Sequence, residues 1–306
     1  MEFISPKYLT EAFEILDEKG GELKICAGLT HILRFYSDFP EELSNFYKGV
    51  LHIGDMTPLA ECREESGRYS IGAVTKIAAL EADAYLARYA PSVLDAAHST
   101  STPQIRNHRT VGGEIAWGSY HSPLITTFMA LKAKVRIRLR SSRGQAGREE
   151  NIELVDLYDG EIERSSTGGG QHTSRNARTK SQDLILKFIL PSEVLHMPGA
   201  FSFFRALTPK ISTENSGVVL AVSGVAQNGV IHSASMVASG LWIGTLEAKL
   251  PLEGVKMSDA HIFERLYAFC DRYSFDRYRR EGPSASQLGL VVFGLLKEGF
   301  SGLLGR

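Results

Sequence analysis

Two glycine-containing turns carry the residues of this chain that could bind a ligand. The first reads Thr110-Val111-Gly112-Gly113-Glu114, with β-branched residues before the glycines and an apolar run after them. Glycine takes positive φ and lets a ligand approach closely, so peptide N–H groups at such a turn can bind a phosphate. A plain tight turn fits the same residues, so the dipeptide alone leaves both interpretations open.

The second turn joins a predicted strand at residues 23–27 to a helical pattern at 32–36 through Gly-Leu-Thr-His at 28–31. Helix N-termini expose unpaired N–H groups and a partial positive charge, which favour anions. A β–α turn without a ligand is the alternative. No second His, Cys or carboxylate stands at metal-ligand spacing from His31, which favours a simple polar contact for its ring.

The elements that must position these turns follow from hydrophobic periodicity. The predicted helices cover residues 8–19, 32–36, 77–84, 90–98, 245–248, 259–273 and 287–297. The predicted strands cover residues 23–27, 50–53, 133–139, 151–154, 183–190, 217–226 and 231–239, with a turn at 141–144. This mixture predicts an α+β protein.

The strand at 133–139 alternates aliphatic residues with Lys134, Arg136 and Arg138, which places the charges on one face. A nucleic-acid groove could use such a face, but no aromatic residues are interleaved to stack bases. The whole chain carries 34 basic and 35 acidic residues, a net charge of −1, unlike a basic nucleic-acid-binding domain. We therefore expect a solvated sheet face and no nucleic-acid partner.

Length and composition predict an ordinary globular protein: 306 residues, 43% of them hydrophobic, allow one large or two medium domains. The three cysteines, Cys26, Cys62 and Cys270, are widely spaced, so we expect reduced, packed thiols and no disulfide framework, metal or iron–sulfur site. The longest apolar runs, 217–225 and 288–296, are shorter than the roughly 20 residues of a membrane helix. We expect no membrane span, no signal peptide and a cytoplasmic location.

Residues 160–182 form a polar segment rich in Gly, Ser, Thr and Arg. Its three glycines at 168–170 follow no strand and precede no apolar helix, so they are no nucleotide fingerprint. The composition predicts a linker or a flexible lid.

The order and spacing of several short motifs resemble one known family. These motifs are Pro-Gln-Ile-Arg-Asn at 103–107, Thr-Val-Gly-Gly at 110–113, Pro123 and Ala-Leu at 130–131. They resemble the signature of the FAD-binding medium subunits of molybdenum hydroxylases, the family of xanthine, carbon monoxide and nicotinate dehydrogenases. The stretch CAGLTHIL at 26–33 is similar to that family's Ala-Gly-Gly-Thr-Asp-Leu loop, and YSIGAVT at 69–75 is similar to a further passage.

The resemblance implies an α+β fold with two parts. A PCMH-type FAD-binding domain of two α/β subdomains, about 1–54 and 55–176, would occupy residues 1–176. A linker and connecting strand would follow at 177–196. Residues 197–306 would form a C-terminal α+β domain like that of the carbon monoxide dehydrogenase flavoprotein.

The resemblance also implies an oxidoreductase subunit that binds FAD. In that family, electrons pass from a molybdopterin-binding large subunit through an iron–sulfur subunit to FAD, and then to NAD or another acceptor. The cofactor itself supplies the redox chemistry, so no catalytic side chain is expected. Carried over by position, the cofactor-binding residues are Ala27, Gly28, Leu29, Thr30, His31, Thr100, Thr110, Val111, Gly112, Gly113, Glu114, His121, Ile185 and Arg205.

Four residues depart from the family pattern. Leu29 replaces a glycine, and His31 replaces a polar or acidic residue. Glu114 stands where the family has Asn, and His121 where it has Asp. A carboxylate at 114 would repel a pyrophosphate unless a counter-charge accompanies it.

These departures keep a second hypothesis open, a flavin-free structural paralogue that keeps the fold and docks to partner subunits. A third hypothesis is a hydrolase that uses His98, His108 or His121 with a nearby serine. The sequence contains no G-x-S-x-G elbow and no H-E-x-x-H motif, which disfavours the hydrolase.

Overall fold

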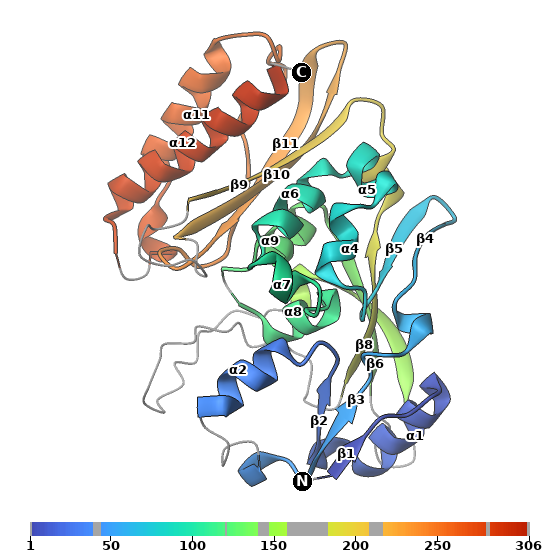
Figure 1. Ribbon diagram of the computed structural model, residues 1–306. Coiled ribbons are helices and arrows are strands. Elements are labelled where there is room, and N and C mark those ends of the chain that lie inside the picture. Colours follow the sequence, from blue (N-terminus) through green and yellow to red (C-terminus); the bar gives the residue numbers. More distant parts are fainter. Residues whose placement is uncertain are drawn as a thin grey trace. The chain divides into compact units, whose positions relative to one another are not determined.

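The computed structural model describes residues 2–38, 44–119, 121–139, 147–157, 183–207, 217–279 and 282–304 (Figure 1). Contacts within the chain divide it into two compact units, which are described separately. Unit 1 contains Met1–Ala79, Thr102–Gly118 and Ala133–Leu190. Unit 2 contains Leu80–Ser101, Ser119–Lys132 and Pro191–Arg306.

A three-stranded parallel sheet opens unit 1, in the order β1 (Glu2–Ile4), β3 (Gly49–His52), β2 (Leu23–Cys26). The amphipathic helix α1 (Leu9–Lys19) buries Ala12 and Leu16 in the core that Leu51 of β3 also enters. A single 3-10 turn (Gly20–Glu22) then leads into β2. The turn after β2 therefore leaves from the carboxyl end of a parallel strand, where open α/β sheets bind ligands.

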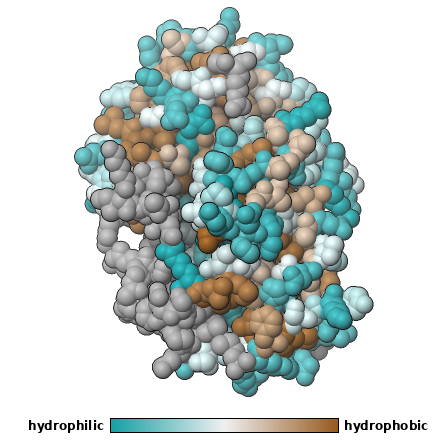
Figure 2. Space-filling view, in the orientation of Figure 1, coloured by the Kyte–Doolittle hydropathy of each residue, from teal (hydrophilic) through white to brown (hydrophobic). Residues whose placement is uncertain are grey.

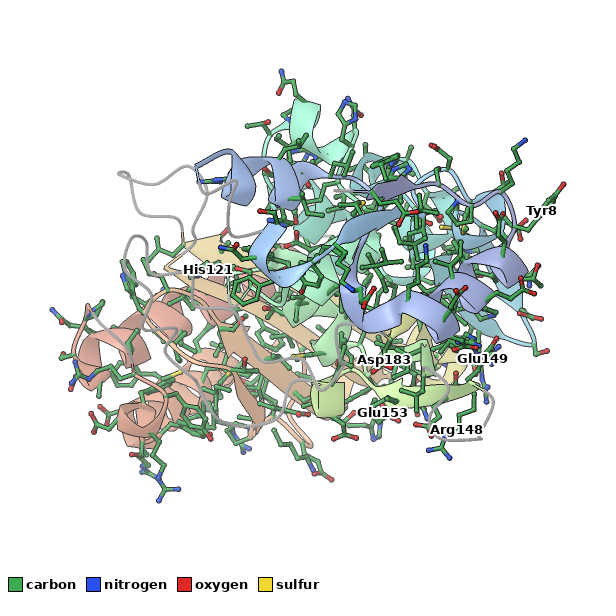
Figure 3. The ribbon with its side chains drawn as sticks, turned by 90° about the horizontal axis from the view of Figure 1, so that it is seen from below. Tyr8, His121, Arg148, Glu149, Glu153 and Asp183 are labelled. Atoms are coloured by element: carbon green, nitrogen blue, oxygen red, sulfur yellow. The ribbon has the colours of Figure 1, made fainter. Side chains whose placement is uncertain are left out.

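A five-stranded antiparallel sheet completes unit 1, and its strand order is β4-β5-β8-β6-β7. Its strands are β4 (Cys62–Glu65), β5 (Arg68–Gly72), β8 (Leu184–Leu190), β6 (Lys134–Leu139) and β7 (Arg148–Glu153). The other elements assigned to this part are α2 (Thr30–Asp38), α7 (Pro103–Arg106), α8 (Val111–Trp117), and 3-10 turns at Thr57–Leu59 and Val155–Leu157. On the edge strand β7, Arg148 and Glu149 are exposed (Figure 3), as charged residues on unpaired strand edges usually are.

The expected solvated face of the 133–139 strand is wrong at Arg138, which is 8% exposed. Helix α1 covers this end of β6. The Arg138 guanidinium donates from Nη1 and Nη2 to the two Asp17 oxygens at 3.0 and 2.6 Å, and it lies 4.3 Å over the Phe13 ring. Lys134, earlier on the same face, is half-exposed as expected and pairs with Glu153. The alternation identified the strand, and only the packing of α1 decided which of its cations is buried.

Unit 2 is built on a four-stranded antiparallel sheet in the order β12-β11-β10-β9. The strands are β9 (Ala200–Leu207), β10 (Val218–Gln227), β11 (Val230–Ser239) and β12 (Leu246–Lys249). The helices are α5 (Ala84–Tyr89), α6 (Pro91–Ser99), α9 (Pro123–Ala130), α10 (Ser192–Leu195), α11 (His261–Arg272) and α12 (Ala285–Leu304), with α4 (Ile77–Glu81) crossing from unit 1 and a 3-10 turn at Phe275–Arg277. Figure 1 shows α11 and α12 on one face of the sheet and α6 and α9 on the other.

Strand β10 is buried on both faces. Leu220 and Val222 belong to the core that α11 and α12 complete. Ala221 is fully buried as well, on the face that α9 covers. On that same face, the Ser223 hydroxyl donates to the Ala130 carbonyl at 2.6 Å. A run without alternation is what a strand between two helical layers requires.

The helix expected at 245–248 is wrong, because these residues belong to the strand β12, which pairs antiparallel with β11. A short stretch such as Leu246-Glu247-Ala248 carries helix-forming residues, and pairing with a neighbouring strand overrides that preference. Helix α12 is long and apolar enough to cross a membrane by length and composition, a test that core helices also pass. Here α12 buries Leu288, Val292 and Leu296 in the core of unit 2.

Cys26 and Cys270 are both buried, as expected of packed thiols. The polar segment 160–182 and the turn at 141–144 lie outside the described residues. The division of the chain near residues 176 and 197 stays a prediction. On the face shown in Figure 2, hydrophilic and hydrophobic side chains are intermixed, in keeping with a net charge of −1.

Candidate functional site

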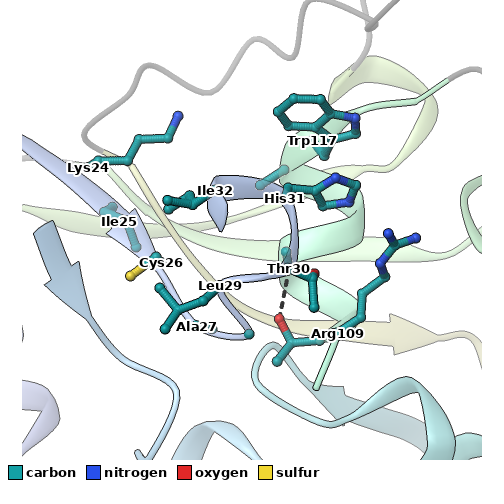
Figure 4. Close-up of a pocket in the computed structure, with 14 residues that line it drawn as sticks. Lys24, Ile25, Cys26, Ala27, Leu29, Thr30, His31, Ile32, Arg109 and Trp117 are labelled. Carbon is teal, nitrogen blue, oxygen red and sulfur yellow. Dashed lines mark hydrogen bonds between the residues drawn. The ribbon is translucent and has the colours of Figure 1, made fainter. Parts of the chain in front are cut away.

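A pocket of about 120 Å³ in unit 1 brings the two glycine-containing turns together. Residues 24–32, which are the end of β2 and the start of α2, line one side (Figure 4). The other side is formed by Arg109, Thr110, Gly113, Ala116 and Trp117, at and inside the start of α8. The pocket thus contains seven of the residues that the resemblance implies for a cofactor, which are the five from Ala27 to His31 and the pair Thr110 and Gly113.

The start of α2 offers free backbone donors to this pocket. The Leu33 N–H closes the first turn by donating to the Leu29 carbonyl at 2.8 Å. Within the described residues, no protein group accepts the N–H groups of residues 29–32. These donors, with the partial positive charge of the helix end, suit a phosphate.

The start of α8 differs, because its N–H groups are bonded inside the protein. The N–H groups of Val111 and Gly112 donate to carbonyls in the segment 73–75, at 2.9 and 2.7 Å. The hydroxyl of Thr110, the N-cap residue, accepts the Gly113 N–H at 3.1 Å. The sequence predicts that both turns offer backbone donors, whereas in the structure the open donors belong to α2 and α8 supplies the opposite wall.

Glycine at position 28 is needed for backbone packing. A Cβ atom there would lie 2.3 Å from the His108 carbonyl oxygen, well inside van der Waals contact. The same oxygen accepts a hydrogen bond from Lys76 Nζ at 3.3 Å. Burial lowers the pKa of Lys76, against the opposing charge of Asp55. A Cβ at Gly113 would meet only the Thr110 hydroxyl, so this glycine leaves room in the pocket.

Leu29 has φ +59°, in the left-handed region. A non-glycine residue pays roughly 1–2 kcal/mol for that conformation, which explains why the family pattern has glycine here. The Leu29 side chain is partly buried and packs against Cys26 and Val50. This packing offsets part of the strain, so the fold keeps a backbone turn that the sequence does not favour.

A buried charge cluster lies beside the pocket. Glu114 is 3% exposed, and its Oε2 lies 3.3 Å from Arg109 Nη1 and 3.5 Å from His31 Nε2. Arg109 therefore supplies the counter-charge that Glu114 requires near a pyrophosphate. His31, another departure from the family pattern, adds to it only when its ring is protonated. Among the described residues, Arg109 Nε and His31 Nε2 are buried without a hydrogen-bond acceptor.

The His31 ring is stacked on Trp117, with ring centroids 4.5 Å apart and planes 9° from parallel (Figure 4). The sequence reading missed Arg109 and Trp117. Arg109 directly precedes the N-cap Thr110, and Trp117 stands three residues after Glu114, which places it on the same face of a helix. Helical spacing from Glu114 could have identified Trp117, but no pattern indicated that α8 faces His31.

The remaining predicted residues lie elsewhere. Ile185 is buried in β8, pairs with Ile137 and does not line the pocket. Thr100 belongs to unit 2, where its hydroxyl donates to the Ala96 carbonyl at 2.7 Å. These two residues therefore have structural contacts within their own units.

His121 and Arg205 also belong to unit 2. The backbone N–H of His121 donates to the Ser119 hydroxyl at 3.3 Å, and Figure 3 labels its position. Arg205 Nε lies 3.1 Å from Glu298. Within the described part of the chain, no group of three or more His, Cys, Asp or Glu residues could hold a metal ion.

Fold and pocket together define an α+β protein with a pocket at the N-terminus of a helix, where the backbone donors suit an anion. The family described as the FAD binding domain in molybdopterin dehydrogenase matches residues 1–193. The chain belongs to this family, and its cofactor is FAD. Three features fit a pyrophosphate-containing cofactor: the open N–H groups of residues 29–32, the Arg109 guanidinium and His31 ring nitrogens that have no acceptor among the described residues, and the space left at Gly113.

Named relatives agree with this family. The nicotinate dehydrogenase FAD-subunit of Eubacterium barkeri is 29% identical over 161 residues, 52% of this chain and 51% of that protein. The xanthine dehydrogenase FAD-binding subunit of Escherichia coli is 32% identical over 140 residues, 44% of each chain. The chain thus spans about half the length of the curated relatives that it matches.

Solved structures share the fold over nearly the whole chain. A chain of carbon monoxide dehydrogenase from Hydrogenophaga pseudoflava matches with a TM-score of 0.73 at 17% identity, covering 98% of this chain and 96% of that one. A chain of quinoline 2-oxidoreductase from Pseudomonas putida 86 matches with a TM-score of 0.76 at 14% identity, covering 99% and 97%. The α+β fold that the resemblance implied is confirmed, and the flavin-free alternative is not favoured.

Proposed function

We propose that this chain is the FAD-binding electron-transfer subunit of a molybdopterin-dependent hydroxylase or dehydrogenase. The observation that carries this proposal is the pocket at the start of α2, where the N–H groups of residues 29–32 have no protein acceptor among the described residues. A pyrophosphate is the anionic part of FAD, and a helix N-terminus binds such a group through backbone donors. Bound FAD would supply the one- and two-electron chemistry.

The residues of the chain then have binding roles. The N–H groups of residues 29–32 would hold the pyrophosphate, and Arg109 would add a cation from the opposite wall. Thr110 would keep the start of α8 in place by capping it. Thr100, Ile185 and Arg205 remain proposed flavin or adenine contacts on the resemblance alone, and His121 remains a proposed cofactor contact.

The proposed partners are an iron–sulfur subunit that delivers electrons and a molybdopterin-binding large subunit that carries the substrate chemistry. NAD or another acceptor would take the electrons from FAD, and the assembly would lie in the cytoplasm. The names of the relatives, which include FAD subunits of nicotinate and xanthine dehydrogenases, support this arrangement. We further propose residues 1–176 as the FAD-binding domain and 197–306 as the C-terminal domain, joined by 177–196.

The first test is FAD binding by the purified chain. We expect flavin absorption after purification, or after FAD is added to the stripped protein, and saturable quenching of flavin fluorescence. Gly28→Ala should weaken binding, because its Cβ would displace the turn from the His108 backbone. Gly294→Ala is the matched control, since nothing lies within 4 Å of a Cβ there.

A folded protein that stays colourless and takes up no FAD would contradict the proposed function. The electron-transfer role is tested separately, by mixing the FAD-loaded chain with a reduced iron–sulfur partner and following loss of the oxidised flavin absorption. Failure of reduction with intact FAD binding would leave the cofactor site in place and contradict the proposed partners.

A further inference from the structure

His31 occupies the first turn of α2 within the phosphate-binding pocket. Its backbone N–H is one of the open donors, and its ring lies between Trp117 and the Glu114 carboxylate. The ring nitrogen Nε2 is 3.5 Å from Glu114 Oε2 and has no hydrogen-bond acceptor among the described residues. The side chain lines the pocket and is 21% exposed, so a ligand there can contact the ring, whereas Nε2 itself is buried.

Two groups beside the ring would attract a positive charge on it. The buried Glu114 carboxylate has its Oε2 3.5 Å from Nε2. The face of Trp117 carries the negative part of the aromatic quadrupole, which attracts a stacked cation. Histidine in general changes its charge between about pH 5 and 8.

Two further basic side chains line the pocket with His31. Arg109 comes from the segment before α8 and Lys24 from β2. Burial raises the pKa of the Cys26 thiol on β2 to about 12, against the opposing Lys24 charge. His52 on β3 is the other titratable ring, with Nε2 donating to the Ala27 carbonyl at 3.0 Å.

The charge balance decides what protonation does. Lys24 and Arg109 are basic side chains that line the pocket together with His31. A protonated His31 would add one positive charge to them, and this charge would attract the negative pyrophosphate.

We propose that His31, in its protonated form, is a positioning residue for the FAD pyrophosphate and makes this chain bind FAD more tightly as the pH falls. The inference rests on the proposed function of this pocket. Glu114 then holds the His31 ring and Arg109 at the pocket wall. In this proposal, the two departures from the family pattern, Glu114 in place of Asn and His31, act together. A hydrogen bond from a charged donor is stronger than one from a neutral donor by roughly a factor of ten in affinity.

The test measures the FAD dissociation constant by flavin fluorescence between pH 5.5 and 8, at constant ionic strength. The wild-type chain should bind about tenfold more tightly at the acidic end. His31→Gln, which keeps a donor and cannot be charged, should show a pH-independent affinity near the wild-type value at pH 8. His98→Gln is the matched control, because that exposed ring contacts Glu81 in unit 2 and its removal should change nothing.

A second readout does not depend on affinity. By linkage, a tenfold change in affinity requires FAD to raise the midpoint of the His31 titration by about one pH unit. NMR of chains with carbon-13 labelled histidine, with and without FAD, measures this shift, and His31→Gln assigns the resonance. His31→Asn serves if the Gln variant is unfolded by circular dichroism.

The possible results of these experiments distinguish a failure of this inference from a failure of the proposed function. FAD binding with the same pH dependence in wild type and His31→Gln would overturn the inference and leave the cofactor site standing. Loss of the dependence in His52→Gln alone would assign it to the other ring and also overturn the inference. Absence of FAD binding at every pH would contradict the proposed function itself.

Discussion

The Glu114 carboxylate lies 3.3 Å from Arg109 Nη1 and is almost completely buried. A carboxylate at the start of α8 also interacts favourably with the positive end of the helix dipole. The residue that makes the sequence motif unlike an FAD site is therefore neutralised before any ligand enters. The same contact keeps the guanidinium at the pocket wall.

This ion pair gives the first prediction. Arg109→Ala should lower the free energy of unfolding by about 3 kcal/mol, because it removes the guanidinium that lies 3.3 Å from a buried carboxylate. Adding Glu114→Gln to that variant should recover a large part of the loss, since a neutral amide then replaces the buried carboxylate. Urea denaturation of the single and double variants measures both effects. A double variant no more stable than Arg109→Ala would contradict the pairing.

The two pocket glycines should respond differently to alanine. Gly28→Ala should destabilise by about 2 kcal/mol, because its Cβ would overlap the His108 carbonyl. Gly113→Ala should change stability by less than about 1 kcal/mol, since alanine favours helix and meets only the Thr110 hydroxyl. Thermal unfolding of both apoproteins measures the difference. Equal losses would show that the close approach at residue 28 is not needed.

The backbone of Leu29 predicts that glycine is more stable than alanine at this position, the reverse of the usual order of stability inside a helix. At φ +59°, Leu29→Gly should be more stable than Leu29→Ala by about 1 kcal/mol, because only glycine avoids the steric cost. Both variants lose the same packing, so their difference isolates the backbone. At exposed Leu33 inside α2, the Ala variant should instead be the more stable by about 1 kcal/mol. Urea midpoints of the four variants provide the measurement, and the same order at both positions would contradict it.

Arg138 should be a stability determinant of unit 1. Arg138→Ala removes the bidentate ion pair with Asp17 and the cation–π contact with Phe13. We expect the free energy of unfolding to fall by about 3 kcal/mol. Arg136→Ala, on the same strand with a hydrogen bond to Asn151, should cost less than about 1 kcal/mol. Chemical denaturation compares the two, and similar small losses would mean that α1 does not bury this pair.

The buried thiols predict a loss of stability in alkali. Burial raises the pKa of Cys270 to about 12 from 9.0, while the unfolded thiol keeps an ordinary value. Between those values the unfolded chain binds fewer protons than the folded chain, so the free energy of unfolding falls as the pH rises. Cys270→Ala should show a shallower fall than wild type from pH 9 to 11. Parallel slopes in urea titrations would show that the thiol ionises freely in the folded protein.

The sequence by itself determined the local features of this protein. Periodicity located α1, β10 and α11, because each buries a regular face or a continuous run, and these patterns need no distant partner. Motif order and spacing indicated the family and its cofactor, since short turns such as 28–31 and 110–113 have local backbone requirements. The charge balance likewise argues against a nucleic-acid-binding domain that is basic throughout.

Only the tertiary structure decided how these features combine. It buried Arg138 beneath α1, made residues 246–249 a strand, and brought Glu114 against Arg109 and His31. It also showed that α8 bonds its own N–H groups to protein, whereas α2 leaves its donors open. The physical reason is that burial, pairing and counter-charge depend on residues far apart in the chain, and side-chain types alone do not specify which of them meet.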